Sequence, residues 1–523
     1  MTMPISPGPR PDDRVVVVGH GPAAHRLVEL LTRRGHRGRI TVLGAEPVPA
    51  YTRPLLSAVL DGSLPGGALT LPAAGAAVVH TGVRATRIDR ECRLVHADDG
   101  SRHPYDRLVL AVGAAPVVPE TVLPGQALPG HGLAGHGLHG PPGRTPPPGP
   151  GVLRTLADCL AVGPGPVVLI GGSLLAVEAG LALRRSGREV ALVHRGGYPL
   201  DRYLDARAGG LLTARLTAAG LDLHLGRTVA DHADGKLTLD DGQVVAAEQV
   251  LLATGVRPRT GLARRAGLPV AEGVLVDERL TTTDPRVYAL GDCAQPATAA
   301  TAGTSGRSGR SGTSTASGSP ARTSRGAGAP VPAGEPFSGH ATAWDQAAVL
   351  AELLSGGTAR FTGSRAPVRL KARELDLVCL GSPEDAEETV VLSDAGGTRY
   401  GRLSLRGNRL CGAVLFGLGQ AAATVARLYE RDEPLPADRL ALLLGSAPGY
   451  ADAGPVGQGS VCHCNNVTGE DLAEAWRAGS RTPEALASAT RATTGCGGCA
   501  GDVRRLCALF AEREPQRKEE DEG

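Results

Sequence analysis

Two short apolar runs each lead directly into a turn of small residues, and this arrangement constrains the fold more than any other feature of the chain. The runs cover residues 14–18 and 166–170, and helix-like segments follow both turns. The turns place small residues where the helices begin: Gly19, Gly21 and Ala24 in the first, and Gly171, Gly172, Ser173 and Ala176 in the second. Glycines at such a turn let backbone amides approach a pyrophosphate at the positive end of a helix. The sequence therefore predicts two dinucleotide-binding turns.

Further short β-branched runs alternate with helix-like segments rich in Ala, Leu and Arg. Together with the two runs above, they cover residues 14–19, 39–44, 107–113, 166–172, 189–195 and 249–255. Such alternation is typical of a doubly wound parallel sheet, and it occurs twice along the chain. The predicted fold class is α/β, with two doubly wound dinucleotide-binding domains and the second inserted into the first.

Glycine and proline account for 73 and 40 of the 523 residues, and much of this excess lies in segments without apolar periodicity. We interpret residues 119–150 and 297–335 as disordered insertions. Residues 511–523 form a charged tail, which we also expect to lack ordered structure. The remaining chain is long enough for several packed domains.

The overall charge gives no support to a nucleic-acid or membrane partner. The chain has 55 Lys and Arg against 53 Asp and Glu, a net charge of +2. It contains no run of 18 apolar residues and no signal-peptide pattern. We therefore expect a cytoplasmic protein whose ten Cys are reduced and, where clustered, serve as metal or redox ligands.

The residues that follow the second strand of each predicted unit indicate how a dinucleotide would be recognised. Glu46 lies 27 residues after Gly19, where a carboxylate can accept ribose hydroxyls. The corresponding strand of the second unit ends in His194 and Arg195 and offers no carboxylate. Because Arg is abundant throughout this chain, Arg195 does not decide between NADH and NADPH, and both stay open.

Four signatures in order resemble the pyridine nucleotide-disulfide oxidoreductase superfamily of flavoproteins. They are the first turn at residues 19–24, LAVGAAP at 110–116, LLATGVRPR at 251–259 and VYALGDCA at 287–294. The resemblance implies that the first turn binds FAD, with Glu46, Gly113 and Gly255 contributing to the site. It also implies that Asp292 binds the ribityl chain of FAD and that the second turn binds NAD(P)H.

The segment that follows the first unit distinguishes between branches of that superfamily. Disulfide reductases carry redox-active Cys there, whereas residues 50–58 contain none. The segment instead resembles the flavin-proximal Y-x-R-P-x-L-S of ferredoxin-reductase-like and nitrite-reductase-like flavoproteins, which implies that Arg53 and Pro54 lie beside the flavin. Many of these flavoproteins pair a Lys after this Ser with a Glu such as Glu178, and Ala58 removes that Lys here.

Four cysteines form the most specific pattern in the chain: Cys462, Cys464, Cys496 and Cys499. Their C-x-C and C-x-x-C pairs are separated by 31 residues, 465–495. C-x-C is unusual for structural zinc, whereas iron–sulfur clusters accept four thiolates at varied spacings, so a cluster is favoured and zinc stays the alternative. With two short helices expected between the pairs, the segment resembles the bacterioferritin-associated-ferredoxin-like domain, which implies a [2Fe-2S] cluster on these four thiolates.

The resemblances together imply four domains: FAD-binding at 14–118 and 246–350, NAD(P)H-binding at 151–245, a small α/β interface domain at 365–435, and a mainly helical [2Fe-2S] domain at 458–510. This order resembles the flavoprotein portion of assimilatory nitrite reductase large subunits and the electron-transfer subunit of assimilatory nitrate reductases. The chain carries no further Cys-rich domain for sirohaem. We therefore expect electrons to pass from NAD(P)H through FAD and the cluster to a separate terminal reductase subunit.

Other interpretations stay open on the sequence alone. One is a ferredoxin or rubredoxin reductase that serves an oxygenase, because the flavoprotein signatures allow it. Another is a non-catalytic iron–sulfur redox sensor, which the substitutions at Ser173, Ala176 and Ala58 would suit. A homodimer is compatible with any of these functions.

Overall fold

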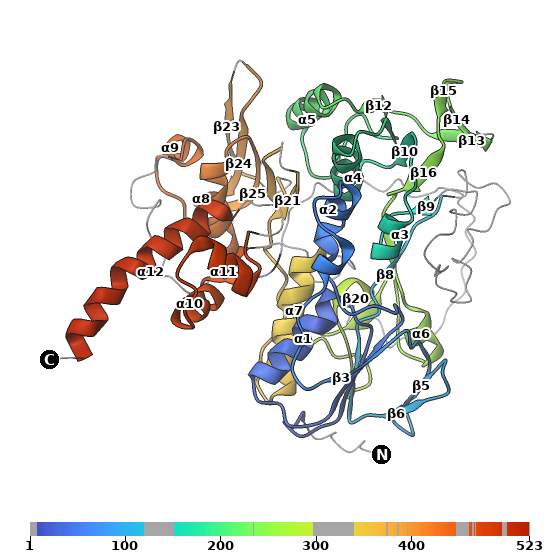
Figure 1. Ribbon diagram of the computed structural model, residues 1–523, viewed down its shortest axis with the longest axis vertical. Helices are drawn as coiled ribbons and strands as arrows, with labels where there is room; N and C mark the ends of the chain where they lie inside the picture. Colours follow the sequence, from blue (N-terminus) through green and yellow to red (C-terminus); the bar gives the residue numbers. More distant parts are fainter. Residues whose placement is uncertain are drawn as a thin grey trace, which may run out of the picture.

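The computed structural model (Figure 1) describes residues 8–119, 151–233, 235–296, 339–372, 375–383, 386–394, 396–445, 460–462, 465, 467–493 and 499–521. The expected insertions at 119–150 and 297–335 lie outside these residues, apart from Pro119. All six apolar runs expected to form strands do so, as β1, β2, β7, β10, β11 and β16. None of the helices in the described ranges combines the length and apolar character needed to span a bilayer.

The first large sheet has five parallel strands in the order β19-β7-β1-β2-β3. These strands are β1 (Val15–Val18), β2 (Ile40–Gly44), β3 (Val78–Thr81), β7 (Arg107–Leu110) and β19 (Val287–Ala289). The central β1 is four consecutive valines, all buried, as expected for a strand covered on both faces. Helix α1 (Pro22–Arg33) follows β1 and packs against α7 (Gly339–Leu354).

The second large sheet is also parallel, in the order β12-β11-β10-β16-β9. Its strands are β9 (Gly151–Val152), β10 (Val167–Ile170), β11 (Val190–His194), β12 (Asp222–Leu225) and β16 (Gln249–Leu252), and its helices are α3 (Leu156–Leu160), α4 (Leu174–Arg185) and α5 (Ala206–Ala218). Because β7 and β19 of the first sheet flank this whole unit in sequence, the second domain is inserted into the first, as predicted.

The boundary between the two domains lies later than the sequence suggested. We expected the second domain to end at residue 245, but β16 pairs with β10 inside the second sheet. The chain returns to the first domain only through β17 (Val256–Pro258), which pairs antiparallel with β8 (Ala114–Pro116). A buried apolar strand such as β16 carries no mark of which sheet it joins, so its sequence alone could not place the boundary.

Smaller elements complete the two domains. Two antiparallel three-stranded sheets are formed by β4 (Ala85–Asp89), β5 (Leu94–Ala97) and β6 (Arg102–Pro104), and by β13 (Val229–Ala233), β14 (Lys236–Leu239) and β15 (Val244–Ala246). A parallel pair joins β18 (Val274–Val276) and β20 (Ala294–Pro296). The short helices are α2 (Leu56–Leu60), α6 (Gly261–Arg265) and the 3-10 turns η1 (Arg53–Leu55), η2 (Gly66–Leu69) and η4 (Gly291–Cys293).

The third unit is a five-stranded antiparallel sheet in the order β21-β22-β25-β24-β23. Its elements are β21 (Val368–Arg369), β22 (Leu377–Gly381), β23 (Glu388–Ser393), β24 (Tyr400–Arg406), β25 (Arg409–Phe416), α8 (Gly419–Glu430) and α9 (Arg439–Leu443). Helix α8 packs its buried face on β25 and β22. The antiparallel pairing of its strands distinguishes this unit from the two parallel sheets.

The C-terminal module consists of a short hairpin and three helices: β26 (Ser460–Cys462), β27 (Val467–Thr468), α10 (Gly469–Arg477), α11 (Pro483–Thr490) and α12 (Ala500–Asp521). The two helices expected between the cysteine pairs are confirmed. Thr468 caps α10 in a reciprocal box with Asp471, and Thr482 caps α11. The expectation for the charged tail is wrong, because α12 continues to Asp521. Glu, Lys, Arg and Gln are good helix formers and can extend a helix that has already begun.

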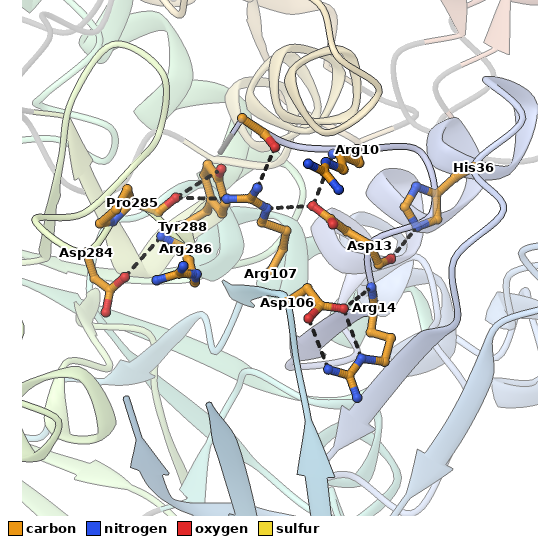
Figure 2. A network of polar contacts seen from close by, with 11 residues as sticks. Arg10, Asp13, Arg14, His36, Asp106, Arg107, Asp284, Pro285, Arg286 and Tyr288 are labelled. Carbon is orange, nitrogen blue, oxygen red and sulfur yellow. Dashed lines mark hydrogen bonds and ion pairs between the residues drawn. The ribbon is translucent and has the colours of Figure 1, made fainter. Parts of the chain in front are cut away.

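A network of polar contacts ties the start of the chain to the first sheet (Figure 2). Arg107, whose side chain is 5% exposed, donates from Nε to Asp13 at 2.7 Å. The same guanidinium also reaches the carbonyls of Gly8, at 2.7 Å, and Pro285, at 3.4 Å. Gly8 and Asp13 belong to the start of the chain and Pro285 to the segment before β19, so one buried cation joins these two distant segments at the amino end of β7.

We expect Arg107→Gln to lower the free energy of unfolding by about 3 kcal/mol, because it leaves the Asp13 carboxylate without its buried cation. Arg14→Gln is the matched control: Arg14 also pairs with an aspartate, Asp106 at 2.9 Å, but its side chain is 50% exposed. That exposed pair should contribute at most about 1 kcal/mol. Urea unfolding of the holoprotein measures both, and equal losses would contradict the assignment.

Candidate nucleotide and cluster sites

The first turn brings backbone into close contact at the carboxyl edge of the first sheet. Gly19 has φ +114°, and a Cβ on it would lie 2.1 Å from the carbonyl oxygen of Ala111. Only glycine fits there. Gly21 is the N-cap residue of α1. Because it has no side chain, it cannot cap the first backbone amides of that helix. Ala24, fully buried, packs the start of the helix onto the sheet.

Glu46 lies beside the flavin-proximal segment rather than in isolation. Its carboxylate accepts a 2.8 Å hydrogen bond from the hydroxyl of Tyr51 and pairs with Arg53, which starts η1 and is followed by Pro54. Burial opposes ionisation of Glu46, but Arg53 and the Tyr51 hydroxyl together hold the pKa of this carboxyl below its usual value. Glu46 is thus an anion held in place at the edge of the sheet.

Asp292 belongs to η4, after β19, and its carboxylate is already engaged. Arg154 donates to Asp292 Oδ2 at 2.5 Å, and the backbone carbonyl of Arg154 accepts from Arg53 at 3.1 Å. The expected ribityl-binding residue and the expected ribose-binding residue are therefore joined through two arginines. A carboxylate can accept several hydrogen bonds, so this pair leaves acceptor capacity for a ligand hydroxyl.

Positive charge is in excess around these two carboxylates. Arg259, from the LLATGVRPR signature, donates its backbone amide to Gly113 at 2.9 Å. Burial lowers the pKa of Arg259, and three nearby guanidinium groups lower it further: Arg84, Arg154 and Arg53. An anion placed among these groups would relieve their mutual repulsion. The pyrophosphate of FAD is such an anion, so the residues of this site fit the cofactor.

Two further expected residues of the first site sit at backbone positions that favour glycine. Gly113 has φ +66° and Gly255 has φ +102°, and the segments that contain them pair through β8 and β17. Cys293, next to Asp292, is fully buried, and its Sγ donates to the Leu110 carbonyl at 3.3 Å. Burial raises the pKa of this thiol to about 11, which makes it unreactive near neutral pH.

The second turn repeats the geometry of the first. Gly171 has φ +122°, and a Cβ on it would lie 2.5 Å from the carbonyl oxygen of Ala253. Ser173 donates its hydroxyl to that same carbonyl at 2.9 Å and accepts from the amide of Ala176 at 3.3 Å. Ser173 is therefore the N-cap of α4. A Cβ on Gly172 would lie 2.6 Å from the ring of His194, so this glycine lets the turn rest on that imidazole.

Two other residues predicted for the second site lie in different surroundings. Glu178 is buried in α4, and its Oε1 accepts from the backbone amide of Lys371 at 2.8 Å, so its carboxylate meets the third unit. Arg195 follows β11 and is exposed. His194 is buried; burial lowers the pKa of its imidazole, and Asp201 acts in the opposite direction. The role of Glu178 near a nicotinamide stays a prediction.

Two of the four predicted cluster ligands are among the described residues. Cys462 ends β26 and Cys499 directly precedes α12, and both are buried. The backbone amide of Thr493 donates to Cys499 Sγ at 3.2 Å. Amide donors to sulfur and the positive end of a helix both stabilise a thiolate, which suits a ligand of an iron–sulfur cluster. Cys464 and Cys496 lie outside the described residues.

Two family models match the chain. The model described as pyridine nucleotide-disulphide oxidoreductase matches residues 13–306, and the model described as BFD-like [2Fe-2S] binding domain matches residues 460–508. Among solved structures, a covalent putidaredoxin reductase–putidaredoxin complex covers 83% of this chain and 95% of its own, with a TM-score of 0.65 at 22% identity. A structure named Fdr9 covers 85% of this chain and all of its own, with a TM-score of 0.63 at 26% identity.

Two curated relatives from Bacillus subtilis (strain 168) match nearly the whole chain. A nitrite reductase [NAD(P)H] is 27% identical over 93% of this chain and 56% of its own length. An assimilatory nitrate reductase electron transfer subunit is 27% identical over 96% of this chain and 60% of its own length. The chain thus spans less than two thirds of the length of both relatives.

Asp292→Ala should weaken the retention of FAD at least about ten-fold, because a hydrogen bond to a charged group contributes about 1.5–3 kcal/mol. Asp106→Ala is a suitable control. Asp106 is another arginine-paired aspartate of the same domain, but it directly precedes β7, at the amino edge of the sheet, whereas Asp292 lies at the carboxyl edge. Flavin absorbance after extensive dialysis measures the retention. A variant at Asp292 that stays fully loaded while the protein remains folded would count against this site.

Proposed function

The chain belongs to the pyridine nucleotide-disulphide oxidoreductase family, and from this premise we propose that it passes electrons from NAD(P)H through FAD and a [2Fe-2S] cluster to a separate terminal reductase in nitrate or nitrite assimilation. The two family matches establish an NAD(P)H-dependent oxidoreductase whose cofactors are FAD, NAD(P)H and a [2Fe-2S] cluster. FAD can accept two electrons as hydride and release them singly to an iron–sulfur cluster. The chain's own contribution is to hold the two centres in fixed positions.

One observation carries this proposal: the C-terminal module packs on the flavin-proximal segment. Cys462 and Cys499 belong to the same apolar cluster as Leu55 and Leu56, which are part of that segment, and as Leu69. A further contact joins Arg33, in α1, to Asp471, in α10, at 3.0 Å. A cluster held by these cysteines would therefore face the part of the first domain that lies beside the flavin.

Arg491 makes the most specific contact between the module and the first domain. It has a left-handed backbone conformation, φ +65°, just after α11. Its guanidinium donates to the backbone carbonyls of Ala68, at 2.7 Å, and Thr70, at 2.5 Å. Residues 69–71 in turn bond to the backbone of Ala50 and Thr52. Only one layer of backbone hydrogen bonds separates Arg491 from the flavin-proximal segment.

The other side of Arg491 leads to the cluster cysteines. The side-chain amide of Asn465, a neighbour of the C-x-C pair, donates to the Arg491 carbonyl at 2.6 Å. Two residues beyond Arg491, the amide of Thr493 donates to Cys499 Sγ. Arg491 is thus connected to both cysteine pairs and to the flavin segment, which supports electron transfer between the two centres within one chain.

The names of the relatives bear on the acceptor. An electron transfer subunit of assimilatory nitrate reductase matches this chain along 96% of its length, cluster module included. By contrast, a nitric oxide reductase FlRd-NAD(+) reductase from Klebsiella pneumoniae (strain 342), 31% identical, matches only 54% of the chain. A reductase for a ferredoxin or a rubredoxin would not need a fused cluster module. The fused module favours a dedicated reductase partner.

The acceptor can be tested directly. The purified protein is reduced anaerobically with NADH or NADPH, followed by visible and EPR spectroscopy, and is then mixed with assimilatory nitrate reductase, with nitrite reductase, or with a ferredoxin or a rubredoxin. We expect both centres to be reduced and to be reoxidised fastest by a nitrate or nitrite reductase. Faster reoxidation by the small carriers would support the alternative, and a flavin that no nicotinamide reduces would indicate a non-catalytic sensor.

Cys499→Ser should abolish the iron–sulfur absorbance but leave electron transfer from NAD(P)H to a dye at the flavin largely intact. Cys507→Ser is the matched control, because Cys507 is another buried cysteine of the same module that lies outside the predicted ligand set. It should retain the cluster. Loss of zinc without any change in the visible spectrum of the Cys499 variant would exclude an electron-exit role for this module.

Arg491→Ala should slow internal electron transfer from flavin to cluster, because it removes two charge-assisted hydrogen bonds, each worth about 1.5–3 kcal/mol, that hold the module in place. Stopped-flow absorbance separates this step from flavin reduction by the nicotinamide, whose rate should not change. Arg477→Ala, an exposed arginine at the end of α10, provides the control. Unchanged cluster reduction in the Arg491 variant would contradict its positioning role.

A further inference from the structure

A carboxylate lies beside the second dinucleotide turn, although β11, the strand that would usually end in one, does not. Rossmann-type sites usually place an Asp or Glu after the second strand, where it hydrogen-bonds the ribose hydroxyls of NAD. Here that position is held by His194, at the end of β11. However, the loop that follows turns back, and Asp201 Oδ2 lies 3.4 Å from His194 Nε2. A carboxylate therefore reaches the end of β11 from seven residues further along the chain.

The loop that carries Asp201 is anchored to the glycine turn itself. The amide of Leu200 donates to the carbonyl of Gly172 at 2.8 Å. Leu200 is 2% exposed and adopts φ +60°, a strained conformation for a leucine. A Cβ on Gly196 would lie 2.2 Å from Asp201 Oδ2, so the loop needs glycine there to let the carboxylate in. A strained backbone and close contacts that hold a loop in one conformation are more typical of a binding site than of a surface loop.

His194 provides a second, independent observation. His194 is 8% exposed, and its buried Nε2 faces Asp201 Oδ2 at 3.4 Å without making a well-aligned hydrogen bond to any described residue. Buried polar atoms are nearly always well paired in folded proteins, so a nitrogen that makes only this long pair with Asp201 among the described residues favours a ligand hydroxyl as an additional partner beside the glycine turn. Asp201, by contrast, keeps 37% of its side chain exposed and is open to an incoming hydroxyl group.

We propose that Asp201 is the ribose-recognising carboxylate of the second site, that His194 completes the contact with the ribose hydroxyls, and that this chain uses NADH in preference to NADPH. A carboxylate accepts hydrogen bonds from the free hydroxyls of NADH and repels the 2'-phosphate of NADPH. The inference rests on the NAD(P)H oxidoreductase activity alone and is independent of the terminal acceptor.

The opposing feature is Arg195, which is exposed beside this site and could meet a 2'-phosphate. A second arginine that follows the neighbouring strand, Arg227, is already paired with Asp241 at 2.6 Å. Arginine is common throughout this chain, so the presence of Arg195 alone is weak evidence for a 2'-phosphate site. The carboxylate and the imidazole, both held against the turn, outweigh it.

The test compares steady-state reduction of a dye by NADH and by NADPH in the full-length holoprotein. Wild type should show a kcat/KM at least about ten-fold higher for NADH. Asp201→Asn should lower kcat/KM for NADH about ten-fold, mainly through KM, and leave NADPH unchanged or improved. Asp222→Asn is the matched control: Asp222 also pairs with a histidine, His224 at 3.0 Å, but lies at the start of β12, away from the turn.

Each outcome decides the proposal. A change in the ratio of NADH to NADPH activity supports recognition of the ribose, because damage to the fold alone would reduce both activities equally. The proposal is overturned if wild type prefers NADPH and Arg195→Gln removes that preference, or if Asp201→Asn leaves the ratio unchanged. Failure of the protein to reduce nitrate or nitrite reductases would affect the proposed acceptor but not this inference.

Discussion

The architecture depends on two close approaches of backbone to backbone at the carboxyl edges of the two parallel sheets. At each, the first glycine of a turn lies against the carbonyl that follows the neighbouring strand: Gly19 against Ala111, and Gly171 against Ala253. A side chain at either glycine would collide with that carbonyl. Since the turn, the following helix and the groups around it are positioned by this contact, both nucleotide sites follow from the same steric constraint.

Features encoded over a few neighbouring residues could be predicted from the sequence. The apolar strands, the glycine turns and the caps at Thr468 and Thr482 belong to this class, because local sterics and hydrogen bonding define them. Arg154, Arg259 and Arg491 could not be predicted. They make contacts between distant segments, and in a chain with so many arginines no single one carries a signal. Asp201 could not be predicted either, because it reaches His194 only through the folding of the loop between them. The boundary at β16 was missed for the same reason.

Both nucleotide turns have a carboxylate nearby, but this carboxylate comes from a different part of the chain in each case. Glu46 lies close after its strand and is balanced by Arg53, whereas Asp201 arrives on a loop and lies beside His194. The docking of the C-terminal module follows another logic. Arg491 binds main-chain carbonyls, which every residue possesses, so the side chains of the receiving surface can change without loss of these bonds.

The insertion of one sheet into another also limits the order in which the protein can assemble during synthesis. β7 of the first sheet pairs with β19, and the strands of the second sheet lie between these two strands in sequence. The ribosome therefore completes the second sheet before β19 can pair with β7. The second domain can therefore fold while the first is still open at one edge. The hydrogen bond from Arg491 to Ala68 joins residues that are 423 positions apart. Contacts of such sequence separation form slowly, so we expect the C-terminal module to dock after both parallel sheets have folded.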